Sequence, residues 1–266
     1  MLRSFIIVIV CVFTNPMAHA HEFWIAPLAY QVNPFERVVA NFHVGQDFKG
    51  PAFPFVPRRR AQTLIVMNGV VQTYAGMLGD RPALQFDSGD GGLMILAHET
   101  KNDMVTYRDW EKFTGFAQNK DFPAALARHA ERGLPQTGFR ETYRRYAKSL
   151  VAVGRGAGAD QRVGFDIEIV ALGNPYTTSA DHLAVQLWYQ GLPWPGAQVE
   201  IFAKSPDQTV VVTQGRTNAN GVATIAVKPN HTYMIDAVAL EERDGTAPTD
   251  AVWHSLWANL TFYVPE

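Results

Sequence analysis

The sequence predicts a mostly β protein with one helical segment, and three observations lead to this fold class. Short runs of alternating apolar and polar residues, separated by Gly, Pro and Asp, fill residues 38–98 and are typical of strands joined by turns. Residues 107–153 are rich in helix formers, with apolar residues at helical spacing. Further short β-rich runs within residues 160–266 predict a β-sandwich.

The first 20 residues, MLRSFIIVIVCVFTNPMAHA, have the pattern of a secretory signal peptide. Arg3 precedes an apolar run over residues 5–13, and Ala18 and Ala20 form an A-x-A cleavage site. The apolar run is far shorter than the roughly 20 residues of a membrane-spanning helix. We therefore expect cleavage after Ala20, a periplasmic or secreted location, and no stable insertion into a membrane.

Cleavage at this point would remove Cys11, the single cysteine of the chain, together with the charge of Arg3. A mature chain without a thiol excludes a disulfide scaffold, a thiolate metal site and a cysteine nucleophile. It keeps 22 basic and 25 acidic side chains, a formal charge of -3, which is too small an excess to predict nucleic acid as a partner. The 47% hydrophobic composition supplies the material for a large core.

The chain divides into four predicted parts that differ in composition. These parts are a signal peptide, an amino-terminal β domain, a helical segment and a carboxy-terminal β-sandwich domain, at residues 1–20, 21–105, 106–153 and 160–266. The clearest local element is a hairpin at Asn68-Gly69, because this pair supplies the positive φ angles of a type I′ turn. The Gly-rich run 154–160 is expected to be a linker. The last predicted helix carries its apolar residues at Phe139, Tyr143, Tyr146 and Leu150, and Lys148 within it is expected to pair with a carboxylate.

Seven segments spread over the mature chain carry a resemblance to a known family. They are AHAHEFWIAP, HVGQDFKG, YRRYAKSLVAVG, IEIVALGNPY, GLPWPGAQVEIF, RTNANGVATIAV and WHSLWANLTFYV. Together they resemble the domain of unknown function 4198 family of secreted bacterial proteins, some of which are described as nickel or cobalt uptake accessory proteins. The resemblance implies an extracytoplasmic protein with an immunoglobulin-like or transthyretin-like sandwich in its carboxy-terminal part. Because such a fold carries many functions, the site has to be argued from its own residues.

The first candidate site residue is His21, which becomes the amino-terminal residue if the leader is cut after Ala20. A free amino-terminal histidine offers its α-amine and a ring nitrogen, which can close a chelate ring on a transition metal ion. Nitrogen ligands in tetragonal geometry suit Cu(II) or Ni(II). The α-amine has an ordinary pKa of about 7.7 to 8.0, so it loses its proton readily near neutral pH. The alternative is that His21 has no role in metal binding and is only the residue that follows the cleavage site.

A second metal ligand is needed, and His98 and His43 are the candidates. His98 lies at the end of an expected strand, next to Glu99, which could orient its ring. His43 shares a strand face with Val39 and Asn41 and is expected either in the core or on the metal. His254, between two tryptophans, is expected to pack among aromatic rings, with metal ligation as the alternative. We expect the remaining histidines, His129, His182 and His231, to be exposed to solvent.

The sequence therefore predicts a non-enzymatic periplasmic or secreted protein that captures or delivers a transition metal ion through His21. Nickel or cobalt is what the resemblance implies, copper also suits the nitrogen ligands, and an inner-membrane metal transporter would be the partner. One alternative is a copper-dependent oxidative enzyme, which needs His21, its amine and a second imidazole beside an open face. The other alternative is a structural or adhesive module in which the sandwich is the working part. The familiar sequence patterns of phosphate loops, serine hydrolases and zinc proteases do not occur in the chain.

Overall fold

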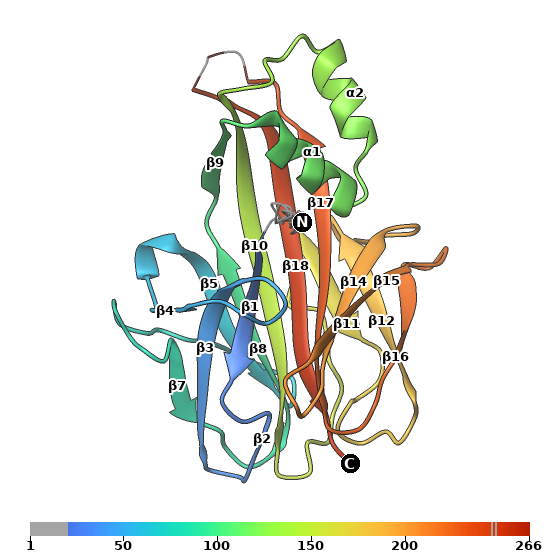
Figure 1. Ribbon diagram of the computed structural model, residues 1–266. Helices are drawn as coiled ribbons and strands as arrows, with labels where there is room; N and C mark the ends of the chain where they lie inside the picture. Colours follow the sequence, from blue (N-terminus) through green and yellow to red (C-terminus); the bar gives the residue numbers. More distant parts are fainter. Residues whose placement is uncertain (1–20, 246, 248) are drawn as a thin grey trace, which may run out of the picture.

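The computed structural model describes residues 21–245, 247 and 249–266. The predicted signal peptide, with its cleavage site and Cys11, lies outside the described residues. Three β-sheets are arranged in layers, with one sheet of ten strands between two smaller sheets. Figure 1 shows the long strands β10, β17 and β18 running the length of the molecule, with both α-helices at one end of them.

The middle sheet is built around two long neighbouring strands, β10 (Phe139–Val153) and β18 (Ala251–Val264). These two strands run parallel, with Tyr146 opposite Ala258. Beyond β18 the sheet continues with β17 (His231–Glu242), β14 (Gln198–Lys204) and β15 (Val210–Arg216). Beyond β10 it continues with β8 (Gly92–Thr100), β5 (Arg60–Met67) and β6 (Val70–Thr73), and β10 also pairs with β2 (Gln31–Val32) and β9 (Asp103–Tyr107).

The two smaller sheets cover opposite faces of the middle sheet. One contains β1 (Glu22–Pro27), β3 (Arg37–Gly45), β4 (Ala52–Phe53) and β7 (Leu84–Asp87). The other contains β11 (Ile167–Ala171), β12 (His182–Tyr189), β13 (Leu192–Pro193) and β16 (Val222–Ala226). Along β8, Ile95 packs into the core beneath β11 and β12, whereas Met94 and Leu96 pack into the core beneath β1 and β3. Successive strand residues point to opposite faces, so β8 is buried on both.

The helical part is short and caps one end of the middle sheet. Helix α1 (Trp110–Asn119) begins at Asp109, whose carboxylate accepts a hydrogen bond from the backbone N–H of Glu111, and helix α2 (Ala124–Glu131) follows it. Both pack on the ends of β10, β17 and β18 through an aromatic cluster that includes Phe113 and Trp253. A 3₁₀ turn, η1, covers Pro57–Arg59. In the described part of the chain, neither helix is long and apolar enough to cross a membrane.

The predicted fold class is confirmed, since the described residues are mostly β strands with a helical segment between two β parts. The predicted hairpin is also confirmed. Asn68 and Gly69 have φ angles of 52° and 77° and connect β5 to β6.

The helical prediction for residues 139–153 is wrong, because this segment is the central strand β10. Its residues from Tyr146 to Val153 are all buried, as expected for a strand covered on both faces. A strand of this kind has no polar face, so its apolar residues do not show the alternation by which exposed strands are recognised. The helix-forming residues at the start of β10 therefore led to the helical prediction.

The middle sheet crosses the predicted domain boundaries, because β10 pairs with β8 on one side and with β18 on the other. The run 154–160, expected to be a linker, ends in the buried residue Asp160. Asp160, Glu168 and Lys148 form a buried group that we call the Lys148 cluster. Lys148 Nζ lies 2.8 Å from Asp160 Oδ1 and 3.2 Å from Glu168 Oε1. The predicted carboxylate partner of Lys148 is thus confirmed, and it ties the run after β10 to β11.

Candidate functional site

His21 is an exposed residue immediately before β1, and it borders a cavity of about 420 Å³. The cavity lies between β9, α1, β10 and β18, and we call it the His21 cavity. Its other lining residues are Met104, Val105, Tyr107, Lys112, Phe116, Glu141, Tyr143, Arg145 and Trp257. Glu22, the next residue of β1, is buried and pairs with Gly45 of β3, so the backbone after His21 is fixed in the sheet.

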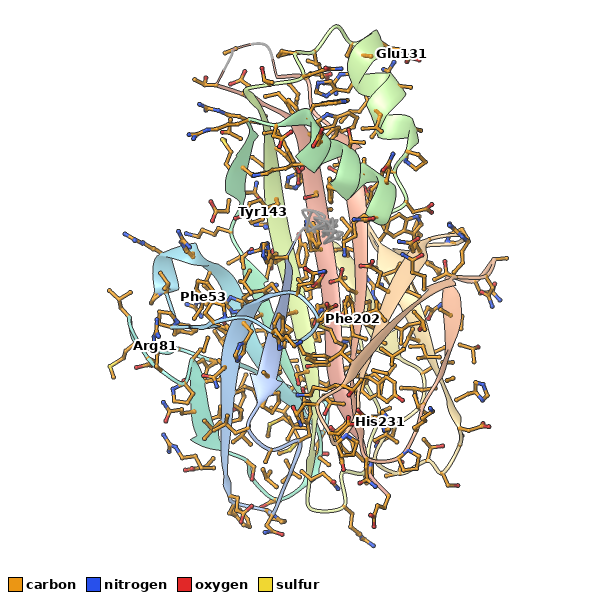
Figure 2. The ribbon with its side chains drawn as sticks, viewed as in Figure 1. Phe53, Arg81, Glu131, Tyr143, Phe202 and His231 are labelled. Carbon is orange, nitrogen blue, oxygen red and sulfur yellow. The ribbon has the colours of Figure 1, made fainter. Side chains whose placement is uncertain are left out.

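One face of β10 supplies three of the polar residues of this cavity. Glu141, Tyr143 and Arg145 are two residues apart, and alternate residues of a strand project from the same face. Figure 2 labels Tyr143 on β10, beside β9 and above the level of Phe53. An acid, a phenol and a guanidinium are therefore presented side by side next to His21.

Glu141 is the buried acid of the His21 cavity. Its carboxylate accepts a hydrogen bond from the Tyr107 hydroxyl at 2.8 Å and a short one from the Ser255 hydroxyl. Burial raises the pKa of Glu141 to about 7, although the two hydroxyl donors and Arg145 act in the opposite direction. Glu141 can therefore take up or release a proton near neutral pH.

A second cavity, of about 300 Å³, adjoins the first, and we call it the His98 cavity. Tyr143 and Arg145 line both cavities. The remaining lining residues come mainly from β1, β3, the β4–η1 segment and β8, and they are Phe23, Phe42, Val44, Phe53, Pro54, Val56, Arg59, His98, Thr100 and Asp103. Six of these are apolar and the others are polar or charged, so the His98 cavity has a mixed lining.

His98, a predicted metal ligand, lies on β8 and is buried in this second cavity. Its Nδ1 is 2.8 Å from the Thr63 hydroxyl, and its ring packs against Phe42 with 4.2 Å between ring centroids. Burial, with Arg60 nearby, lowers the pKa of His98 to about 3. The imidazole is therefore neutral at physiological pH.

His43, the other predicted ligand, lies on the opposite face of the small sheet. Its ring stacks on Trp24 with centroids 5.2 Å apart, and its Nδ1 is 3.0 Å from the carbonyl oxygen of Gly50. Phe42, the residue before it, contacts His98 instead. Because neighbouring strand residues project from opposite faces, the structure does not bring His43 and His98 together. Of the three predicted ligands, only His21 borders the cavity at the start of β1.

The other histidines have ordinary structural surroundings. The expectation that His129 is exposed to solvent is wrong: it is 1% exposed, since its Nδ1 accepts a hydrogen bond from Trp253 and its Nε2 is 3.0 Å from the Pro135 carbonyl. His254 is buried, with Nδ1 2.9 Å from the Thr142 hydroxyl. His182 is exposed and 2.7 Å from Asp181.

A buried group of charges lies beside the start of β1 and was not predicted from the sequence. Lys120 Nζ, at the end of α1, is 3.3 Å from Glu22 Oε1 and 3.1 Å from Asp236 Oδ2, and it makes a short contact with Glu200 Oε2. We call these four residues the Lys120 cluster. The three carboxylates could also face a metal ion, because one oxygen of each lies within 4.8 Å of the others. The lysine ammonium already occupies the position between them, so the chain supplies its own cation.

Two carboxyl groups of the Lys120 cluster hold protons at unusually high pH. Burial raises the pKa of Glu22 to about 8, with Lys120 opposing it and the neighbouring carboxylates adding to it. Burial likewise raises the pKa of Asp236 to about 6. Burial alone lowers the pKa of Lys120, but the three carboxylates around it raise that pKa above its ordinary value. The ammonium thus remains charged while the carboxyl groups share protons.

A family model and two groups of known proteins were compared with the chain. The model described as a domain of unknown function (DUF4198) matches residues 18–241. No curated protein matches the chain. Among solved structures, the crystal structure of a tetra-tandem repeat in the extending region of a large adhesion protein is similar, with 12% identity and a TM-score of 0.20, over 91% of this chain and 49% of that chain. The D0-D1 domain of intimin has 9% identity and a TM-score of 0.20, over 90% of this chain and 97% of that one. The chain spans about half the length of the first of these structures.

Proposed function

The chain belongs to the domain of unknown function 4198 family, and from this premise we propose that it is an extracytoplasmic protein that captures and delivers a transition metal ion. His21, with its α-amine freed by removal of the leader, binds the ion. Nickel, cobalt and copper are the candidate metals, and an inner-membrane metal transporter is the partner that would receive them. The role is binding and transfer rather than catalysis.

The observation that carries the proposal is the position of His21. It is exposed at the start of a strand whose next residue, Glu22, is 3% exposed and bound to Lys120. A chelating amine and imidazole would thereby be attached directly to a rigid strand, on a residue that is exposed to solvent. Fixing ligands before binding reduces the entropy that binding has to overcome.

Further ligands can come from the His21 cavity, which offers groups of two kinds. Met104 supplies a thioether, a soft ligand that suits copper, and Glu141 supplies a carboxylate that is already oriented by Tyr107. Lys112 and Arg145 also line this cavity and disfavour a second cation within it. These charges support one metal ion held at the rim by His21 rather than a metal cluster deeper inside.

The donor set differs from that of the copper-dependent oxidative enzymes, which need two imidazoles. The described lining of the His21 cavity contains no second histidine. His98 lies in the adjoining cavity with one ring nitrogen engaged by Thr63, and His43 is on the far face of β1 and β3. A mature protein that produced peroxide in a copper-dependent manner would contradict the non-enzymatic role.

The test compares the mature protein starting at His21 with a variant that carries one alanine ahead of it. The extension turns the α-amine into an amide that keeps its proton near neutral pH, so the chelate is lost while every side chain stays. We expect the extension and His21→Ala each to weaken binding of Ni(II), Co(II) or Cu(II) by at least about 10-fold in calorimetric titrations. The matched control is His182→Ala, which removes an exposed histidine outside the His21 cavity and should leave the affinity unchanged.

Three results would contradict the proposal. The first is an amino-terminal sequence of the exported protein that does not begin at His21. Equal affinity of the extended and native proteins would show that the amine takes no part in binding. Loss of affinity in His182→Ala but not in His21→Ala would place the metal elsewhere.

A further inference from the structure

Two consecutive arginines of β10 have opposite surroundings. Arg144 projects from the face of Tyr146, and its guanidinium lies 3.2 Å from Glu99 and 3.7 Å from Asp166. Arg145 projects from the other face, towards the two cavities, and within the described residues its guanidinium has no ion pair or hydrogen bond. Its Nε is buried without a partner, and its Cζ lies 4.7 Å from the centre of the Tyr143 ring.

An arginine in this state is costly for the fold. A buried donor without an acceptor loses its hydration and gains nothing in return. Burial also lowers the pKa of Arg145, which indicates that its charge is incompletely compensated, although Tyr143 and Asp103 act in the opposite direction. The missing acceptor is therefore a group that the described part of the chain does not supply.

The lining of the His98 cavity indicates what kind of ligand could supply the acceptor for Arg145. Its wall is formed by Phe23, Phe42, Val44, Phe53 and other apolar side chains, and its volume of about 300 Å³ is at the lower end for ligand pockets. Its polar lining residues are Arg59, His98, Thr100, Asp103, Tyr143 and Arg145. A matching occupant therefore combines a small apolar body with a polar group.

The charge of these polar lining residues favours an anion. Arg59 and Arg145 carry two positive charges, Asp103 carries one negative charge, and His98 is neutral because burial lowers its pKa to about 3. One positive charge remains, which matches a ligand with a single negative charge. In addition, His98 Nε2 makes no hydrogen bond within the described part of the chain. When the Thr63 hydroxyl donates to Nδ1, Nε2 carries the ring proton and can donate it to the ligand.

We propose that the His98 cavity binds a small monocarboxylate with an apolar body. The carboxylate lies against the Arg145 guanidinium, whose planar fork suits two parallel hydrogen bonds to a carboxylate. The body lies among Phe42, Phe53 and Val44. The site shares Tyr143 and Arg145 with the His21 cavity, but none of its contacts involves His21, so it does not depend on the metal proposal.

The experiment uses the mature protein after chelator treatment, with benzoate and hexanoate as probes and benzamide as the uncharged equivalent of benzoate. We expect calorimetric titration to give an affinity for benzoate at least 10-fold above that for benzamide, a difference of about 1.4 kcal/mol. Arg145→Gln should remove this preference and leave benzamide binding unchanged. Arg58→Gln is the matched control, because Arg58 neighbours Arg59 but does not line the cavity.

Two further variants keep the result decisive. Val44→Trp fills the apolar wall and should weaken benzoate and benzamide alike, so the site can be tested even if Arg145→Gln does not fold. His21→Ala should leave benzoate binding unchanged, so that failure of the metal proposal and failure of this one are distinguishable. Equal binding of benzoate and benzamide to the native protein, or no binding of benzoate and hexanoate at millimolar concentration, would overturn the proposal.

Discussion

The Lys148 cluster and the Lys120 cluster both bury a lysine among carboxylates, yet they differ in what else their carboxylates contact. In the Lys148 cluster all four carboxylate oxygens accept hydrogen bonds from backbone N–H groups. In the Lys120 cluster, Lys120 contacts all three carboxylates and Asn259 donates to Asp236, whereas Glu22 Oε2 has no partner in the described part of the chain.

This difference decides how each cluster can respond to pH and to mutation. Backbone N–H groups, fixed by the loop and by β11, favour the charged form of both carboxylates in the Lys148 cluster, although burial raises the pKa of Asp160 against them and against Lys148. The Lys120 cluster has three carboxyl groups for one ammonium, and it balances the excess charge by holding protons. One cluster therefore joins two β parts of the chain, whereas the other can change its protonation next to the amino-terminal strand.

The largest effect is expected from Lys148→Met, which leaves two buried carboxylates whose oxygens are held by backbone donors. Removing one partner of a buried ion pair costs about 3–5 kcal/mol because the remaining charge is uncompensated. The free energy of unfolding, measured by urea denaturation at pH 6, should fall by this amount. A loss below about 1 kcal/mol would show that the backbone donors alone can hold the two carboxylates.

A smaller loss is expected from the matched variant Lys120→Met. The carboxyl groups left behind can take up further protons, so the cost should be that of lost hydrogen bonds, about 1–3 kcal/mol at pH 6. The loss should shrink further at pH 5, where more of the carboxyl groups are neutral. If Lys120→Met costs as much as Lys148→Met at both pH values, the proposed difference between the clusters does not exist.

The smallest effect is expected from changing the pH by one unit. Burial raises the pKa of Glu22 from 4.5 to about 8, so the folded protein keeps a proton that the unfolded chain has released. Stability is therefore lost as the pH rises from about 4.5 towards 8, by at most about 1.4 kcal/mol per pH unit for one retained proton. Glu22→Gln should flatten this dependence between pH 6 and 7. Glu131→Gln, on the exposed side of α2, is the control that should leave it unchanged.

Much of the fold could be predicted because its exposed elements follow local rules. The hairpin at Asn68-Gly69 and the outer strands of the carboxy-terminal part alternate clearly and are separated by turn residues. The central strand β10 could not be recognised in the same way, because it is covered on both faces. His129 was misjudged for a related reason, since its neighbours in the helix are charged but Trp253, far along the chain, buries it.

The candidate site was predicted only in part, for the same physical reason. His21 can be identified from the cleavage pattern alone. In a helix, Glu141 and Arg145 would share a face but Tyr143 would point away from it, whereas all three share one face in a strand. The two-residue spacing of these side chains was the one indication in the sequence that they share a strand face. In the Lys120 cluster, Lys120 is 80 to 116 positions away from each of its three carboxylate partners, so no local sequence pattern contains the cluster.

The position of β18 also makes completion of the middle sheet depend on one strand. This strand lies between β10 and β17, although in sequence it follows all the other described strands. Before residues 251–264 pair, β10 and β17 belong to two half-sheets whose edges are unpaired. Long-range parallel pairing such as that of β10 with β18 is slow to form. The core is therefore expected to remain incomplete until residues 251–264 have paired on both sides, and a chaperone that covers strand edges could bind the chain before that step.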